Sequence, residues 1–180
     1  VTSVAWSPNG QWAVTSGVEG LAYVWDARTG QARLTLAGHT AGISQAAWSP
    51  DGRHILTAGD DGTARVWDAQ TGEAVLLLTG DAGQLTGGTW SPDGALILTT
   101  STDKRVRVWD AETGDLVALL TGHRDVVRDA QWNRDGTALL SSSDDHTVRL
   151  WELAAANQPR GELPVLSGNG WSIEDMVSNR

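Results

Sequence analysis

The sequence lacks cysteine entirely, and its 180 residues include one tyrosine, one methionine and one lysine. Without cysteine the chain has no disulfide framework, no thiolate nucleophile and no cysteine-ligated zinc or iron–sulfur site. This composition fits the cytoplasm, which is the location that we expect. The single Lys104 against twelve arginines, with abundant alanine, glycine and threonine, is typical of a GC-rich bacterial source.

Long apolar runs and an excess of positive charge are also missing. No apolar run approaches the roughly 18 residues that a membrane span needs, and no N-terminal segment resembles a secretory signal. The formal net charge is −9. Because nucleic-acid phosphates and anionic membrane surfaces attract basic proteins, this charge argues against both as the main partner. We therefore expect a soluble protein that binds neither nucleic acid nor membrane.

What the chain contains instead is a repeat with a period of 42 residues. Tryptophan recurs at this spacing in two series, which are Trp6, Trp48, Trp90 and Trp132, and Trp25, Trp67, Trp109 and Trp151. Such self-similarity indicates a repeat architecture. The best-formed copy, residues 38–68, begins with Gly-His and ends with Trp-Asp. Between them, SPDG and DDG turns separate three alternating apolar and polar runs, which predict three β-strands joined by tight hairpins.

Each copy is expected to contain a fourth strand after a Thr-Gly turn, ending at Leu36, Leu78, Leu120 or Leu166. The last copy carries an insertion in residues 154–161, and its fourth strand contains Pro164, which an outermost strand tolerates. The chain starts inside a first strand, and residues 173–178 predict the first strand of a fifth copy. The predicted units are 1–36, 43–78, 85–120 and 127–166, and a fifth begins within 171–180.

Three sets of residues recur with this period. They are the pairs Gly38-His39 and Gly122-His123; the turn acids Glu19, Asp61, Asp103 and Asp145; and the closing pairs Trp25-Asp26, Trp67-Asp68, Trp109-Asp110 and Trp151-Glu152. Together they resemble the WD-repeat (β-transducin-like) β-propeller family over essentially the whole chain. The resemblance implies an all-β fold of four-stranded blades arranged radially around a channel, with first strands lining the channel. Four complete blades and one extra strand predict a partial propeller.

The resemblance also implies a buried hydrogen-bond chain in each repeat, from Trp through Ser or Thr and His to Asp. An indole, a hydroxyl, an imidazole and a carboxylate can satisfy one another away from water. The expected members are His123, Ser142, Asp145 and Trp151; His39, Asp61 and Trp67, with Ala58 replacing the hydroxyl; Thr100, Asp103 and Trp109, with Asp81 replacing the histidine; and Ser16 and Trp25, with Glu19. If Asp81 faced Asp103, one carboxyl would be protonated; we expect the Asp81 loop to point to solvent instead.

Serine, histidine and aspartate together also suggest an acyl-transfer triad. Against this interpretation, the positions recur with substitutions such as Ala58, and no G-x-S-x-G elbow is present. The acidic clusters at residues 60–61 and 144–146 lack the spacing of calcium or zinc sites. We therefore expect no catalytic residue, no metal and no cofactor. An enzyme domain with its active site at the propeller channel remains the alternative.

Function is expected where the repeats vary, on loops and strand ends around one mouth of the channel. The candidate partner-binding residues are Thr40, Ser44, Gln84, Thr86, Arg124, Asp125, Arg128 and Trp171. We expect them to bind a protein or peptide, so the chain would be a non-catalytic interaction scaffold or sensor module. Regular arrays of this kind resemble those at the C-terminal end of large bacterial signalling chains, so signal transduction is the expected setting.

At the blade spacing of a seven-bladed ring, roughly 51° each, four blades would cover only about 206° of a full circle, and rings hold four to eight blades. Three explanations remain open at this stage: a piece of a longer chain, two copies that close a 4 + 4 ring, and a tight ring of four. The absent initiator methionine, the clipped first repeat and the extra strand favour a piece of a longer chain. The expected partners therefore include additional blades, from a parent chain or from a second copy.

Overall fold

The turn between the first two strands of each repeat depends on a short polar motif. In the second repeat Ser49 Oγ donates to Asp51 Oδ1 at 2.6 Å, and the N–H of Arg53 donates to the same oxygen at 3.0 Å. Gly52 closes the turn with φ of 71°, a conformation that glycine adopts without steric cost. The hydrogen bonds and the glycine together reverse the chain and allow the next strand to pair with the previous one.

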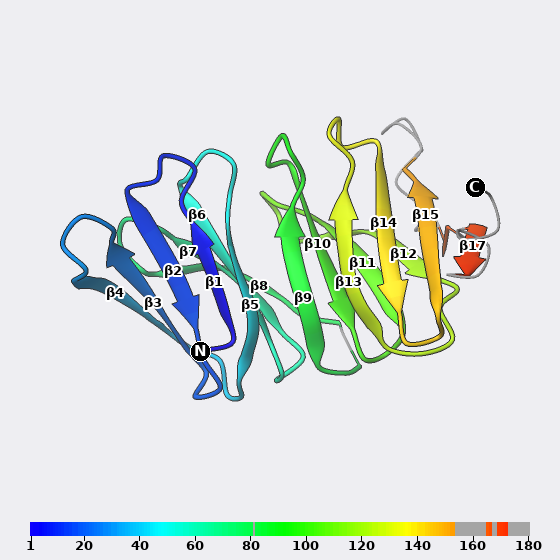
Figure 1. Cartoon of the computed structure of the whole chain (residues 1–180), viewed down its shortest axis with the longest axis horizontal. Helices are drawn as coiled ribbons and strands as arrows, with labels where there is room; N and C mark the ends of the chain where they lie inside the picture. The colour runs from blue at the N-terminus through cyan, green and yellow to red at the C-terminus, as the bar shows by residue number, and fades with distance from the viewer. Residues whose placement is uncertain (81, 154–164, 167–168, 173–180) are drawn as a thin grey trace.

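In the computed structural model, which describes residues 1–80, 82–153, 165–166 and 169–172, the chain forms four sheets that we call blades 1 to 4 (Figure 1). Blade 1 contains β1 (Ser3–Trp6), β2 (Trp12–Ser16), β3 (Leu21–Asp26) and β4 (Ala32–Ala37); blade 2 contains β5 (Ile43–Trp48), β6 (His54–Gly59), β7 (Ala64–Asp68) and β8 (Ala74–Leu78). Blade 3 contains β9 (Leu85–Trp90), β10 (Leu96–Ser101), β11 (Arg105–Asp110) and β12 (Leu116–Thr121); blade 4 begins with β13 (Val127–Trp132), β14 (Ala138–Ser143) and β15 (Thr147–Glu152).

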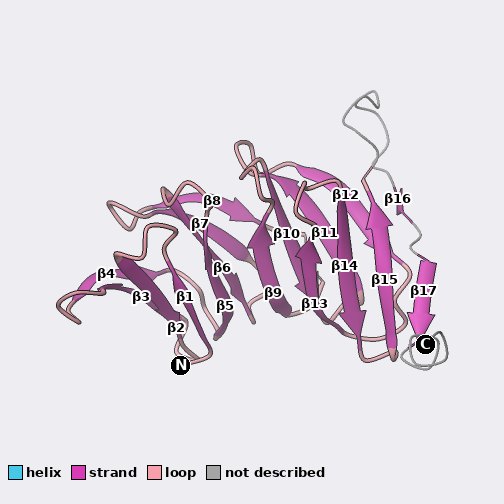
Figure 2. Ribbon diagram, turned by 45° about the horizontal axis from the view of Figure 1, so that its top comes forward, coloured by secondary structure: helices cyan, strands magenta, loops and turns pink. Residues whose placement is uncertain are grey.

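The blades follow one another along an open arc, with blades 1 and 4 at its two ends (Figures 1 and 2). Within each blade consecutive strands pair antiparallel. The described residues therefore form part of a β-propeller, and the all-β fold predicted from the repeat is confirmed. No helix that is long and apolar enough to cross a membrane occurs among these residues.

The outer strand of blade 4 differs from the prediction. The segment ending at Leu166 was expected there, but β17 (Asn169–Ser172) takes this place and pairs antiparallel with β15. The earlier segment, β16 (Val165–Leu166), pairs in parallel with β12 at the outer edge of blade 3. The physical reason lies in the inserted residues, which lengthen the connection, and in Pro164, which has no N–H for a ladder. Residues 173–178, predicted as a fifth first strand, lie outside the described residues.

The hydrophobic core lies between blades. We call the face of a blade that packs on the preceding blade its leading face and the opposite one its trailing face. In the first layer Val14, Ala22, Val24 and Leu36 of the trailing face of blade 1 meet Ile43, Ala46, Trp48, Ile55 and Trp67 of the leading face of blade 2. The second and third layers repeat this arrangement between blades 2 and 3 and between blades 3 and 4. Each interior blade thus contributes one face to each of two layers.

Candidate interaction surface

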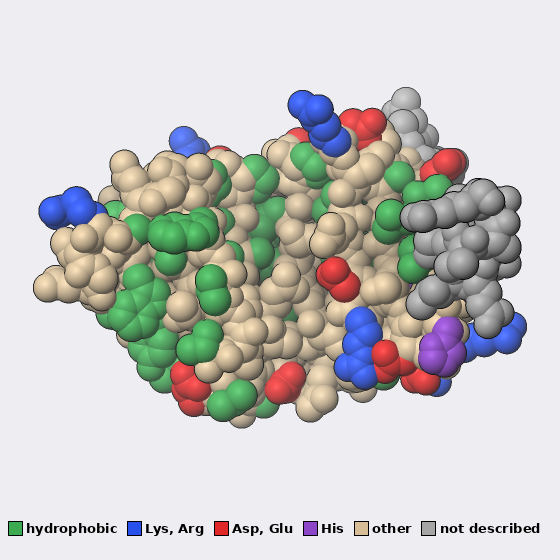
Figure 3. Space-filling model, viewed as in Figure 1, with side chains coloured by type: hydrophobic (Ala, Val, Ile, Leu, Met, Phe, Trp, Pro, Cys, Tyr) green, Lys and Arg blue, Asp and Glu red, His purple; other side chains and the backbone are tan. Residues whose placement is uncertain are grey.

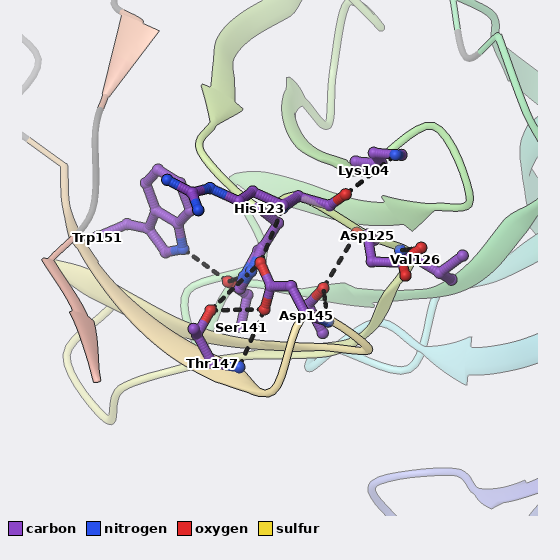
Figure 4. Close-up of polar contacts among 10 residues, drawn as sticks. Lys104, His123, Asp125, Val126, Ser141, Asp145, Thr147 and Trp151 are labelled. Atoms are coloured by element: carbon purple, nitrogen blue, oxygen red, sulfur yellow. Dashed lines mark hydrogen bonds and ion pairs between the residues drawn. The ribbon is translucent and has the colours of Figure 1, made fainter. Parts of the chain in front are cut away.

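A chain of hydrogen bonds crosses the leading face of blade 4 (Figure 4). Trp151 Nε1 donates to Ser141 Oγ at 2.7 Å, and this oxygen lies 2.7 Å from His123 Nε2. His123 Nδ1 lies 3.0 Å from Asp145 Oδ2. An indole only donates and a carboxylate only accepts. Ser141 therefore donates to Nε2, and Nδ1–H of a neutral imidazole donates to Asp145.

Asp145 has two further partners, which connect the network to the neighbouring loops. Thr147 donates through its N–H at 2.9 Å and through its hydroxyl at 2.6 Å, and the N–H of Arg124 donates at 2.8 Å. The contact with Arg124 fastens the backbone of the loop before β13. The sequence prediction missed Thr147 and its counterpart Thr63. Both repeats have a threonine two residues after the turn acid, in the sequences DGT and DHT, and this shared position could have indicated its role.

Blade 2 contains the same network, complete. Thr57 Oγ1 accepts from Trp67 Nε1 at 2.8 Å and lies 2.8 Å from His39 Nε2, and His39 Nδ1 lies 3.0 Å from Asp61 Oδ2. The prediction that Ala58 deletes the hydroxyl was therefore wrong. The N–H of Thr40 donates to Asp61 at 2.9 Å, which fastens the loop before β5 in the same way.

In every repeat the prediction placed the network hydroxyl one residue too late in the sequence. The hydroxyls that accept from the tryptophans belong to Thr15, Thr57, Thr99 and Ser141. The prediction had instead chosen Ser16, Thr100 and Ser142, and had placed Ala58 at this position in blade 2. Neighbouring residues of a strand point to opposite faces. Ile55 and Thr57 therefore face blade 1 with Trp67, whereas Leu56 and Ala58 face blade 3.

Two of the residues named by the prediction, Ser16 and Thr100, belong to the contacts between neighbouring blades, which we call seams. Thr86 Oγ1 lies 2.8 Å from Thr100 Oγ1 and 2.6 Å from the carbonyl oxygen of Val127 in the next blade. Thr2 and Ser16 make the same arrangement toward the carbonyl of Ile43. These hydroxyls therefore join successive first strands and do not extend the tryptophan networks.

Blade 3 replaces the histidine by an arginine. Trp109 Nε1 donates to Thr99 Oγ1 at 3.0 Å, as in the other blades. The turn acid Asp103, however, accepts from Arg107 Nη2 at 2.6 Å, and the side chain of Arg107 is only 3% exposed. The predicted neighbour Asp81 lies outside the described residues. In blade 1 Trp25 donates to Thr15, and Glu19 at the acid position is exposed.

Burial and hydrogen bonds shift the pKa values of these groups in opposite ways. Burial lowers the pKa of His39 and of His123 below the usual 6.5, despite the nearby carboxylates that act to raise it. Burial would raise the pKa of Asp61, but the hydrogen bonds from Thr40, Thr63 and His39 outweigh it and lower this pKa to about 2. The pKa of Asp145 is lowered by the same balance. At neutral pH each network therefore holds a neutral imidazole beside a carboxylate.

These shifts predict a loss of stability in acid. As pH falls below about 6.5, histidines of the unfolded chain take up protons that the buried imidazoles do not, so the free energy of unfolding should decrease. The loss should extend to the lowered pKa of the folded imidazoles. The carboxylate contribution is present above pH 3.8 and should disappear as pH falls toward about 2, the folded pKa of Asp61. Urea unfolding at pH 8, 6.5 and 5.5 measures the first effect.

The matched variant for this experiment replaces both His39 and His123 by glutamine. It should be less stable than the wild type at pH 8, because hydrogen bonds are lost, but its free energy of unfolding should change less between pH 8 and pH 5.5. An equal slope in both proteins would contradict the assignment of neutral imidazoles.

The geometry of Ser141, His123 and Asp145 has the order of an acyl-transfer triad, but the hydroxyl is not placed to react. Ser141 is 2% exposed and its oxygen already accepts from Trp151. A nucleophile needs room for a substrate carbonyl beside it. Because Thr57, His39 and Asp61 repeat the arrangement in blade 2, the contacts belong to the fold of a blade.

A cavity of about 320 Å3 lies at the other end of the first strands, beside the SPDG turns of blades 2 and 3. Its lining contains Trp48, Trp90 and Trp132, and Asp129 is the one ionisable residue among the described residues that line it. General acid–base chemistry normally needs a second titratable group, which this lining does not supply. Within the described part of the chain, no group of three His, Cys, Asp or Glu residues could hold a metal ion.

The loops that precede β5, β9 and β13 form a surface that we call the rim, represented by Thr40, Gln84, Arg124 and Asp125. All four residues are exposed. Hydrogen bonds to the turn acids hold the backbones of these loops. Asp61 and Asp145 accept from the N–H groups of Thr40 and Arg124, and Asp103 accepts from the N–H of Ala82. Side chains of different chemistry thus project from a rigid edge.

The other predicted partner-binding residues are less free. Ser44 donates to the carbonyl of Ala58 at 3.0 Å, and Thr86 is engaged in the seam between blades 3 and 4. Arg128 forms an ion pair with Asp144, with Nε 2.8 Å from Oδ1. Trp171 lies in β17 with its backbone opposite Val148. The side chain of Trp171 lies outside what the structure describes.

Comparison with protein families identifies four matches along this chain. The model described as "WD domain, G-beta repeat" matches residues 1–26, 30–68, 72–110 and 114–152. Each range ends one residue after the closing tryptophan, so the matches follow the same period as the networks. None of the curated proteins compared with the chain matches it.

Proposed function

Since the chain belongs to the WD40-repeat family of β-propeller proteins, we propose that it is a non-catalytic scaffold whose rim binds a protein or peptide. WD40 repeats generally mediate protein–protein interactions. The observation that carries the proposal is the way in which buried carboxylates fix the rim loops. In blades 2 and 4 the carboxylate holds the backbone N–H next to the network histidine, and the following side chains face solvent.

Rigid loops with exposed, varied side chains suit recognition, because little conformational entropy is lost when a partner binds. Lys104 adds to this rigidity, since its Nζ donates to the carbonyl of Arg124 at 3.0 Å and links the edges of blades 3 and 4 (Figure 4). The cavity near Asp129 gives no comparable support to an enzyme, because the described residues of its lining include one ionisable group.

Selection of peptides from a random display library against the wild-type protein tests the proposal. Peptides that bind the rim should lose at least about tenfold in affinity, or about 1.4 kcal/mol, when Arg124 is replaced by glutamate. The matched control is Arg53→Glu, which makes the same charge change in the β5–β6 turn, at the opposite end of the first strands. Peptides that tolerate Arg124→Glu but are lost in Arg53→Glu would contradict the proposal.

We also infer that the chain works in the cytoplasm of a bacterium, as part of a larger signalling protein. The supporting observations are the absence of cysteine, the arginine-rich composition and the resemblance to regular arrays of signalling chains. Cell fractionation that recovers the protein outside the cytosol would contradict this location. The uncovered faces at the two ends of the arc further suggest that additional blades, from a longer polypeptide or from a second copy, complete the propeller.

A further inference from the structure

Apolar side chains are exposed in two settings. At one end of the arc, hydrophobic side chains gather over blade 1, at the left of the face that Figure 3 shows. The additional blades proposed above account for that surface. The second setting is β8, the outer strand of blade 2, where Val75 and Leu77 are 48% and 53% exposed. Blades 1 and 3 are both in place beside blade 2, so a further blade cannot cover these side chains.

The outer edge of blade 3 shows what such a strand can accept. There β16 pairs in parallel with β12, with Leu119 opposite Val165 and Leu120 opposite Leu166. The pairing extends blade 3 beyond the four strands of the repeat. Leu119, with β16 beside it, is half-buried, whereas its counterpart Leu77, one repeat earlier, is exposed. The outer edge of a blade in this protein is therefore compatible with a further, parallel strand.

The sequence of β8 matches that of β12 where β4 differs. The positions of Val75 and Leu77 hold valine and leucine in β12 too, but Arg33 and Thr35 in β4. Arg33 is also engaged, because its guanidinium carbon lies 4.5 Å from the ring centre of Trp12. Natural edge strands often contain charged residues or proline, which discourage pairing with other chains. The five residues of β8, AVLLL, include neither, so this edge is open to pairing.

The repeat that contains β8 has no spare segment to pair with it. Residues 153–164 connect β15 to β16, whereas only residues 79–84 connect β8 to β9. Within the described part of the chain, β8 has no strand on its outer side. A strand that fills this place must therefore come from outside the repeat.

We propose that β8 binds an extended apolar segment of a partner protein, which pairs with Ala74–Leu78 in parallel as β16 does with β12. In such strand addition, main-chain hydrogen bonds provide affinity and side-chain contacts provide specificity. Here Val75 and Leu77 select a segment with adjacent β-branched and leucine residues, like Val165 and Leu166. This inference goes beyond the proposed function, because it assigns a second binding site that is separate from the rim.

An NMR titration of the isotope-labelled chain tests the proposal. The probe is a capped peptide with the sequence of residues 162–168, ELPVLSG, at millimolar concentration, because it lacks the tether that raises the effective concentration of β16. Amide resonances of β8 should shift and those of β4 should not. Leu77→Lys should lower the affinity at least about tenfold. Thr35→Lys, at the matched position of β4, should leave it unchanged. Both side chains are exposed, so neither variant should lose its fold.

Two further arms separate strand pairing from other modes of binding. N-methylation of the valine and leucine amides of the peptide removes ladder donors and should abolish the shifts. Arg124→Glu should not affect this peptide, so the rim and the edge can fail separately. No shift at β8, shifts confined to β12, or equal binding of the methylated peptide would each overturn the proposal. Self-association of the wild type that Leu77→Lys abolishes in sedimentation velocity would overturn it too, because the edge would then bind a second copy.

Discussion

Replacement of Arg107 by methionine should lower the free energy of unfolding by about 3–5 kcal/mol, the usual cost of removing one partner from a buried ion pair. Asp103 accepts from the Arg107 guanidinium at 2.6 Å, and the two side chains are 3% and 8% exposed. Without this guanidinium the carboxylate would lose its buried charge partner and keep only the half-exposed Arg105, whose Nη1 lies 4.0 Å from Asp103 Oδ2. Burial would then raise the pKa of Asp103, which is at present held below its usual value by Arg107 and by backbone N–H groups.

Chemical unfolding at pH 7.5 measures this effect, and two further variants identify its cause. Asp103→Asn in the Arg107→Met background should recover part of the lost stability, since the uncompensated charge is removed. Arg105→Met changes a neighbouring arginine whose side chain is 46% exposed, and it should cost less than about 1 kcal/mol. Equal losses for Arg107→Met and Arg105→Met would show that Arg107 has no special role.

Replacement of Ser141 by alanine should lower the free energy of unfolding by about 2–4 kcal/mol, because it leaves two buried groups without a partner at about 1–3 kcal/mol each. These groups are Trp151 Nε1 and His123 Nε2. The adjacent Ser142→Ala is the matched control, identical in chemistry but on the trailing face of the same strand. It should change stability by less than about 1 kcal/mol.

Thermal and urea unfolding of both serine variants would decide which hydroxyl completes the network. A larger loss for Ser142→Ala would restore the assignment made from sequence. Thr57→Val and Ala58→Ser provide the same comparison in blade 2, where the first should be costly and the second should not disturb Trp67.

The sequence was sufficient for the features that repeat. The period, the turns and the alternation of apolar residues located most strands within a residue or two, and His39, Asp61 and Trp67 meet as the family resemblance implied. These features are local or periodic, so four copies reinforce one signal. The predicted order of strands failed in one place, β17, where a four-residue insertion breaks the period.

The position of the network hydroxyl was predicted wrongly because most copies have hydroxyl residues at two neighbouring positions of the strand. Ser141 is followed by two more serines and Thr99 by another threonine, so either phase of the strand offers a hydroxyl. Blade 2 contained the deciding signal, since Thr57 stands alone before Ala58. A one-residue error moves a side chain to the other face of a sheet, which is why the prediction assigned the seam residues to the network.

The ion pair of Arg107 with Asp103 could not be predicted from the position of the arginine in the repeat. Arginine also occupies residues 65 and 149, so the arginine position does not single out blade 3, although the replacement of the histidine by Asp81 does. In blade 2 the Arg65 guanidinium lies against Gly38, 2.9 Å from where a Cβ would be, and not on the turn acid. The choice between these arrangements depends on whether a histidine already satisfies the carboxylate. The sequence shows that the histidine is missing from blade 3, but which side chain takes its place depends on packing.

The division of the core into shared layers has a consequence for folding. A single blade has two half-layers and no complete hydrophobic interior, so its strands gain little until a neighbour forms. Stability in such a linear array is the sum of weak intrinsic terms and strong nearest-neighbour terms. Cooperativity should therefore spread from blade to blade, with blades 2 and 3 exchanging their amide hydrogens most slowly and the two ends opening first.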